Sequence, residues 1–227
     1  MALKEVVKKK AVARAPGPSG VQLGEESVRA LILQGGAAVI AKRGVRATSV
    51  DDILGASGIS RRTFYRFYEN KEDVLVALYR LGTDELLAAC RRVVAKETDP
   101  VRQLEGCIDA HLRNAKELGR LMFVLGGEAH RQESPLHARR MEVHAELVSL
   151  LENARAAQRG SGKRADPLLY RGLLLSLEGV TRFVLEEGNE GRAVTAASIE
   201  RARRVMMRIA TAAILGEGAG VTKMPTQ

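Results

Sequence analysis

The stretch that decides the fold is residues 49–71, SVDDILGASGISRRTFYRFYENK. Its pattern predicts two short helices joined by a tight turn. Ser49 is suited to cap the first helix, and Asp52, three residues later, completes an acidic capping box. Gly58 can take the positive φ that the turn requires, and Ser60 is suited to cap the second helix. A polar, basic helix after such a turn indicates a helix-turn-helix motif, whose second helix enters the major groove of DNA.

The second helix of this motif carries side chains that suit DNA. Arginine can donate two hydrogen bonds to guanine, whereas threonine and tyrosine hydroxyls suit phosphate oxygens. A solvated helix face is the alternative, although Thr63 and Tyr65 are unusual choices for solvation alone. We expect Phe64 to turn inward. The candidate DNA-binding residues of this helix are Arg61, Arg62, Thr63, Tyr65 and Arg66.

These residues resemble the DNA-binding domain of TetR-type transcriptional regulators. The resemblance runs from about Glu25 to about Leu78, roughly a quarter of the chain. It is carried by the Gly-Ile-Ser turn, by Arg-Thr-Phe-Tyr-Arg-Phe-Tyr, which begins at Arg62, and by Asn-Lys-Glu-Asp-Val-Leu, which begins at Asn70. The remainder is similar to the family in its length and helical pattern.

The resemblance also implies roles for individual residues. Thr63, Tyr65 and Lys71 would contact phosphates, and Ser49 would add a backbone phosphate clamp at a helix N-terminus. The residues implied to read bases are Ser60, Arg61 and Arg62. Some family members carry a base-reading arginine two residues after the position of Ser49, whereas this chain has Asp51 there.

The composition favours a polyanionic partner. The formal net charge is +9, and residues 1–80 hold 14 Lys and Arg against 8 Asp and Glu. Such an excess near the motif suits phosphates, because basic side chains displace condensed counterions. No run of about 18 apolar residues is present, and no apolar segment follows the N-terminal lysines, so we expect neither a membrane span nor a secretory signal. Cys90 and Cys107 are expected to be free thiols in a reducing cytoplasm.

The helical periodicity predicts an all-α chain: a three-helix head and a larger helical body. Beyond the motif, helices are predicted over 25–43, 71–97, 100–118, 120–132, 135–158, 167–187 and 195–215. Three of them begin with a capping residue followed by proline. The predicted organisation is a basic N-terminal arm (1–24), a DNA-binding domain (25–71), a ligand-binding and dimerisation domain (72–216) and a tail (217–227). The arm is either a solvated tail or a segment that touches DNA.

The body offers a candidate ligand pocket. His111 falls on an apolar helix face, where it is either a core histidine or a polar anchor in a mostly apolar cavity. His137 and His144 lie seven residues apart, which is too far along a helix for one metal ion, so no metal site is predicted. The candidate ligand-binding residues are His111, Met122, Phe123, Met141 and His144.

The two C-terminal helices have broad apolar faces. Packing within one chain is one explanation, and a symmetric four-helix bundle with two helices from each subunit is the other. The candidate dimerisation residues are Gly172, Ser176, Gly179, Met206 and Ile209.

The sequence therefore favours a ligand-responsive, sequence-specific DNA-binding regulator, most often a repressor in the family that it resembles. It would act in the cytoplasm as a homodimer on a pseudo-palindromic operator and respond to an apolar small-molecule effector. The alternative is an all-helical interaction protein that binds nucleic acid nonspecifically or not at all. No nucleophile motif or Gly-rich phosphate loop is present, so neither an enzyme nor a cofactor is expected.

Overall fold

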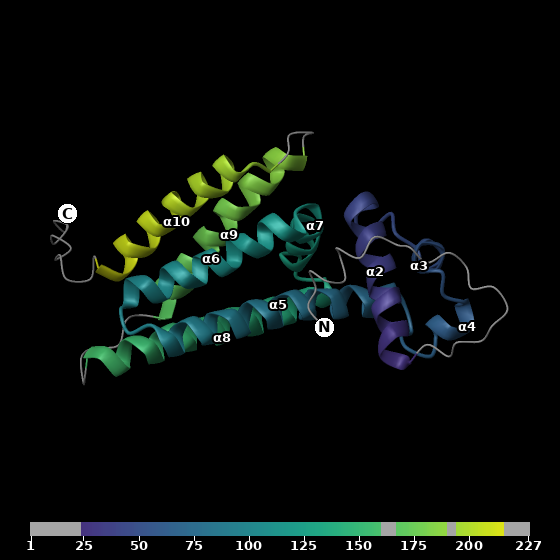
Figure 1. The fold of residues 1–227 in the computed structure, drawn as a ribbon, viewed down its shortest axis with the longest axis horizontal. Coiled ribbons are helices and arrows are strands. Elements are labelled where there is room, and N and C mark those ends of the chain that lie inside the picture. The colour runs from purple at the N-terminus through teal and green to yellow at the C-terminus, as the bar shows by residue number, and fades with distance from the viewer. Residues whose placement is uncertain (1–23, 160–166, 190–193, 216–227) are drawn as a thin grey trace, which may run out of the picture. The chain divides into compact units, whose positions relative to one another are not determined.

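The computed structural model describes residues 24–159, 167–189 and 194–215 of the 227-residue chain (Figure 1). Over these residues every regular element is an α-helix, which confirms the predicted all-α class. None of the described helices is long and apolar enough to cross a membrane. The predicted N-terminal arm up to residue 23, the tail from 217 and the capping residue Asp166 lie outside the described residues.

The helices keep the labels of Figure 1. Their bounds are α2 Glu25–Arg43, α3 Val50–Ser57, α4 Arg61–Phe64, α5 Lys71–Lys96, α6 Pro100–Leu118, α7 Arg120–Ala129, α8 Pro135–Arg159, α9 Pro167–Asn189 and α10 Ala196–Leu215. The predicted bounds of α2 and α6 agree with the structure to the residue. α4 is shorter than the expected helix, because the chain leaves the α-helix after Phe64 and passes through turns at residues 65–67.

Capping side chains explain several helix starts. Asp99 Oδ1 accepts hydrogen bonds from the amides of Val101 (2.7 Å) and Arg102 (3.0 Å) at the start of α6. Ser134 Oγ accepts from the amide of Leu136 (3.2 Å) at the start of α8. Each cap satisfies a backbone donor that the first helical turn leaves unpaired, so the acid-proline and serine-proline pairs are start signals here.

The described residues fall into two compact units. The first lies within Met1–Ala88 and Asn114–Val143, and the second within Ala89–Arg113 and His144–Gln227. α5, α6 and α8 each contribute residues to both units. The predicted functional boundary between residues 71 and 72 remains a prediction.

The core of the first unit joins the three-helix head to α7. Phe64 of α4 and Ile53 of α3 are completely buried against α2 and the start of α5. α7 adds Leu121 and Leu125 to the same core, and the Arg120 guanidinium donates to the backbone oxygen of Ala41 at the end of α2. The core of the head is therefore closed by α7 as well as by its own helices.

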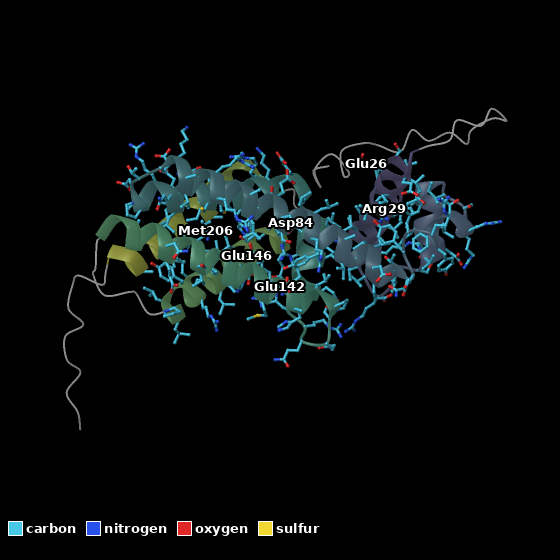
Figure 2. The ribbon with its side chains drawn as sticks, turned by 90° about the horizontal axis from the view of Figure 1, so that it is seen from below. Glu26, Arg29, Asp84, Glu142, Glu146 and Met206 are labelled. Carbon is cyan, nitrogen blue, oxygen red and sulfur yellow. The ribbon has the colours of Figure 1, made fainter. Side chains whose placement is uncertain are left out.

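The second unit has a separate core, built from α6, α8, α9 and α10. Tyr170 of α9 and Met206 of α10 are its largest fully buried side chains (Met206 is labelled in Figure 2). An ion-pair cluster joins α10 to α6, because Arg203 Nε donates to Asp109 (2.7 Å) while the same guanidinium also pairs with Glu105. α9 and α10 run side by side as a helix pair (Figure 1).

Candidate nucleic-acid interface

The first helix of the motif begins with the predicted capping box. Ser49 Oγ accepts from the amide of Asp52 (3.2 Å), and the Ser49 amide donates to Asp52 Oδ2 (2.9 Å). The Ser49 hydroxyl also donates to Asp52 Oδ2 (2.7 Å). The two hydrogen bonds that Ser49 donates to this carboxylate, helped by the nearby Arg43 guanidinium, hold the pKa of Asp52 below its usual value. The Ser49 amide, implied by resemblance to clamp a phosphate, therefore already has an acceptor in the DNA-free chain.

The second feature of the motif is the close approach of α2 and α3. A Cβ atom at Gly35 would lie 2.8 Å from the backbone nitrogen of Ser57 and 2.9 Å from its Cβ. Only a glycine lets the two backbones come this near. The turn that follows has Gly58 at φ +69°, a left-handed conformation that favours glycine.

The short helix α4 is anchored by one side chain and presents the others. Ser60 Oγ accepts from the amide of Thr63 (3.1 Å), which caps the helix as predicted. Phe64 is fully buried and meets the ring of Tyr65 edge to face, with centroids 5.4 Å apart. The Tyr65 side chain is 49% exposed, and Arg61 is exposed as well. The buried phenylalanine thus fixes which polar side chains point outward.

Three arginines of the head have acidic partners in the DNA-free chain. Arg61 pairs with Asp51 and Arg43 pairs with Asp52. Arg66 lies 3.7 Å from a carboxylate oxygen of Glu25. All of these groups are largely solvent-exposed except Asp52, so the pairs are weak and can be exchanged for phosphate contacts.

Arg62, by contrast, is exposed and forms no ion pair with another described residue. Arg46 is a further exposed arginine, in the loop before Ser49, which the sequence analysis did not single out. Its position in a basic head, three residues before Ser49, is the signal that could have marked it.

Lys71 has a structural role in addition to the predicted one. Its Nζ donates to the carbonyl oxygens of Thr48 (2.9 Å) and Val45 (3.2 Å), in the loop between α2 and α3. An ammonium group has three donors, so one N–H is left for a phosphate. Lys71 therefore ties the first turn of α5 to the loop that leads into the motif.

Two of the five candidate ligand-binding residues face α9 in the second unit. His111 Nε2 lies 2.8 Å from Thr181 Oγ1, and His144 Nε2 lies 2.8 Å from Glu178 Oε1. Because the Thr181 hydroxyl already donates to the Leu177 carbonyl (3.0 Å), His111 must be the donor to Thr181. Burial lowers the pKa of His111, against an opposing effect of the Glu178 charge, so the imidazole is held neutral.

The other three candidates belong to the first unit. Met122 and Phe123 are half-buried on α7, and Met141 of α8 is exposed. The fully buried face of α7 is instead the one that carries Leu121 and Leu125 and covers the head. A shared ligand pocket for all five residues remains a prediction.

The candidate dimerisation residues divide in a similar way. Gly172 and Ser176 are exposed on α9, Gly179 is half-buried, and a Cβ at either glycine would meet no atom within 4 Å. Ile209 is half-buried, but Met206 is completely buried in the core of its own unit. Met206 therefore cannot offer its side chain to a partner as predicted, because α10 turns it toward its own chain.

Over the described residues, a helix-turn-helix head and a larger helical body define the class of fold. Residues 32–78 match the family model of bacterial regulatory proteins of the tetR family. This match lies within the segment, about residues 25–78, that carries the resemblance to that family.

Individual relatives match part of the chain. The transcriptional repressor KstR2 of Mycobacterium tuberculosis is 32% identical over 108 residues, which cover 48% of this chain and 54% of KstR2. The chain thus spans about half the length of the curated relatives it matches.

Solved structures extend the similarity to most of the chain. The fatty acid degradation regulator FadR from Bacillus halodurans aligns with a TM-score of 0.66 and 20% identity over 86% of this chain and 97% of that one. FadR from Bacillus subtilis, solved with stearoyl-CoA, aligns with a TM-score of 0.64 and 18% identity over 78% and 96% of the two chains. At these identities the likeness concerns the fold.

Proposed function

We propose that the chain is a sequence-specific DNA-binding transcriptional regulator, with repression as its mode of action. The observation that carries the proposal is the α4 surface, where buried Phe64 fixes the helix while Arg61, Arg62 and Tyr65 face solvent. The head is rich in arginine, and the matched relative KstR2 is named as a transcriptional repressor. Such a protein would act in the cytoplasm, where bacterial DNA lies.

The contacts follow from the chemistry of the exposed groups. Arg61 and Arg62 would enter the major groove and donate to guanine, which supplies sequence discrimination. Thr63 and Tyr65 would hold phosphates and fix the register of α4 on the duplex. The Thr63 side chain is half-buried and bonded to Ser60 (2.8 Å), so of the two Tyr65 has the freer hydroxyl.

The test is a salt titration of binding to a candidate operator and to random DNA of equal length. Inverted repeats in the DNA beside the gene supply the candidate operators. A regulator should bind its operator at least about 10³-fold more tightly than random DNA. Equal affinity for both would favour the alternative, an interaction protein with a nonspecific basic head.

We also propose a homodimer that uses the exposed face of α9. Leu168 and Phe183 are each 71% exposed, and Leu175 is 51% exposed. With Gly172 and Gly179 between them, these residues recur every three to four positions and form one stripe along α9. Large exposed apolar side chains in a row mark an interaction surface. A second copy would cover the stripe symmetrically and set two recognition helices on successive major grooves.

Replacement of Phe183 by glutamate tests this interface. Because Phe183 is exposed in the single chain, the substitution should leave the fold intact and weaken the dimer. Gly172→Leu and Gly179→Leu should do the same, because each glycine faces open space within its own chain. Glu187→Ala, also exposed on α9, is the control. An unchanged dimer mass by light scattering in all three variants would place the interface elsewhere.

For the effector we propose a mostly apolar small molecule that binds the body. His111 and His144 supply polar anchors next to the apolar core of the second unit, and a solved structural neighbour holds stearoyl-CoA. A long-chain acyl-CoA is therefore the first probe, in a thermal-shift assay followed by operator binding. A ligand that releases DNA must itself bind DNA-bound protein more weakly by the same factor. If the acyl-CoA bound tightly but left the affinity for the operator unchanged, it would not control DNA binding, and that part of the proposal would be wrong.

A further inference from the structure

The two cysteines of the chain come together in the second unit. Cys90 lies on α5 and is 2% exposed, whereas Cys107 lies on α6 and is half-buried. Both are free thiols, and they lie close enough together that each shifts the pKa of the other. Seventeen positions along the chain separate them, so the hairpin of α5 and α6 is what makes them neighbours.

The register of this helical hairpin supports the pairing independently. Gln103 of α6 donates from Nε2 to the carbonyl oxygens of Val94 (3.3 Å) and Glu97 (2.7 Å) of α5. Four residues back from Val94 is Cys90, and four residues on from Gln103 is Cys107. Each step is about one helical turn, and because the two helices are antiparallel, both steps lead in the same direction in space. The cysteines therefore face each other about one turn away from the glutamine contacts.

The helices also approach closely at this level. A Cβ at Gly106, the residue before Cys107, would lie 2.6 Å from Val93 Cγ1. A disulfide needs Cα atoms about 4.4–6.8 Å apart, nearer than ordinary helix packing at about 8–10 Å between axes provides. A glycine at the contact allows this nearness, because it removes the side chain that would keep the backbones apart.

We propose that Cys90 and Cys107 form a dithiol oxidation site, which peroxide converts to a disulfide between α5 and α6. Cys107 is the attacking residue, since it is the more exposed of the two. Its thiolate attacks one peroxide oxygen, so that the O–O bond breaks and a sulfenic acid forms with release of hydroxide. The Cys90 sulfur then attacks the Cys107 sulfur, an S–S bond replaces the S–O bond, and the Cys90 proton leaves with the oxygen as water.

The electrostatics of the pair favour the same order. Hydrogen bonding by the neighbouring Cys90 thiol lowers the pKa of Cys107, although burial opposes this effect. The same hydrogen bond, together with burial, raises the pKa of Cys90. Cys107 is therefore the group that more readily becomes a thiolate, which is the nucleophilic form. The site does not depend on the proposed DNA-binding function.

The test uses the full-length protein and hydrogen peroxide. In the wild type, oxidation should remove both titratable thiols, lower the intact mass by two hydrogens and yield one cross-linked peptide without dimers on a non-reducing gel. In Cys90→Ala the sulfenic acid on Cys107 should persist and be trapped by dimedone. In Cys107→Ala, the matched control, Cys90 should remain unmodified. Circular dichroism checks that both variants fold.

Three results would overturn the proposal. The first is a folded wild type that keeps both thiols under excess peroxide. The second is a disulfide that joins two chains, which would show that the partner of each cysteine lies in another molecule. The third is a dimedone adduct on Cys90 in Cys107→Ala with none on Cys107 in Cys90→Ala, which would reverse the assigned order. The wild-type measurement stands even if a variant fails to fold.

Discussion

Arg61 of α4 and Asp51 of α3 form an ion pair across the helix-turn-helix motif. The pair joins the proposed base-reading helix to the helix before it, and both side chains remain mostly exposed. Asp51 therefore competes with DNA for the Arg61 guanidinium and places a negative charge beside the expected phosphates.

Asp51→Asn should tighten binding to operator and random DNA alike, by about 0.5–1 kcal/mol, because an exposed ion pair is worth no more than that. Fluorescence anisotropy at fixed salt measures the effect. Glu187→Gln, the same charge change on exposed α9, should leave the affinity unchanged. Weaker operator binding by Asp51→Asn alone would instead show that Asp51 orients Arg61 or reads a base itself.

Tyr65→Phe should weaken binding to every DNA sequence by a similar factor, because the hydroxyl is assigned to a phosphate rather than to a base. Tyr68→Phe is the matched control, since Tyr68 is buried in the core of the head. Its affinity for DNA should stay at the wild-type value. A loss of affinity confined to the operator would move Tyr65 from phosphate contact to base recognition.

Lys71→Ala should lower the stability of the first unit as well as its affinity for DNA. The ammonium group holds the carbonyl oxygens of Val45 and Thr48, and loss of such charged hydrogen bonds costs about 1.5–3 kcal/mol. Urea unfolding measures the first effect, and the salt slope of binding, expected to fall by about one, measures the second. Lys42→Ala is the control, because Lys42 is exposed at the end of α2. If Lys71→Ala were as stable as the wild type but had a lower salt slope, the phosphate contact would be the only role left for Lys71.

Gly35→Ala should destabilise the head by about 1–3 kcal/mol, because its Cβ would meet the backbone of Ser57 and force α3 away from α2. Gly55→Ala, in the middle of α3 with no atom within 4 Å of the new Cβ, should stabilise it by about 0.5–1 kcal/mol. Urea unfolding of the two variants should therefore move in opposite directions. Equal stability of Gly35→Ala and wild type would argue against the close approach.

The stability of the second unit should fall as the pH drops below 6.5. Burial lowers the pKa of His111 in the folded chain relative to its ordinary value of 6.5, so in this range the unfolded chain binds more protons than the folded one. His111→Gln, which keeps a donor for Thr181, should show a weaker pH dependence, and His130→Gln, at the exposed end of α7, should behave as the wild type. The measurement is thermal unfolding of all three chains between pH 5 and pH 8, about the range over which histidine titrates. Parallel curves of stability against pH for the wild type and both variants would contradict the prediction.

Much of the fold follows from local signals. The capping box at Ser49, the left-handed Gly58 and the proline that opens α6 each act within a few residues, so the sequence marks them directly. The length of α4 was overestimated, because the pattern of outward polar residues continues through the turns after Phe64.

Contacts between distant segments were harder to infer. The sequence of α7 does not indicate that Leu121 and Leu125 pack against the head. The same apolar periodicity would also be expected of a helix that lines a ligand cavity. Met206 illustrates the same limit, since an apolar stripe does not tell whether its own chain or a partner covers it. The ion pair of Asp51 with Arg61 and the carbonyl contacts of Lys71 likewise depend on tertiary packing.

The separation of the two cores has a genetic consequence. The clusters around Phe64 and around Met206 have no residue in common, so damage to the first need not affect the second. A chain whose head is unfolded by mutations such as Gly35→Ala would keep the exposed stripe on α9 through which we propose that subunits pair. In a cell that carries both alleles, such chains would draw intact subunits into mixed pairs with a single working head. We expect the mutant allele to be dominant negative, while an allele that damages only the stripe should be recessive.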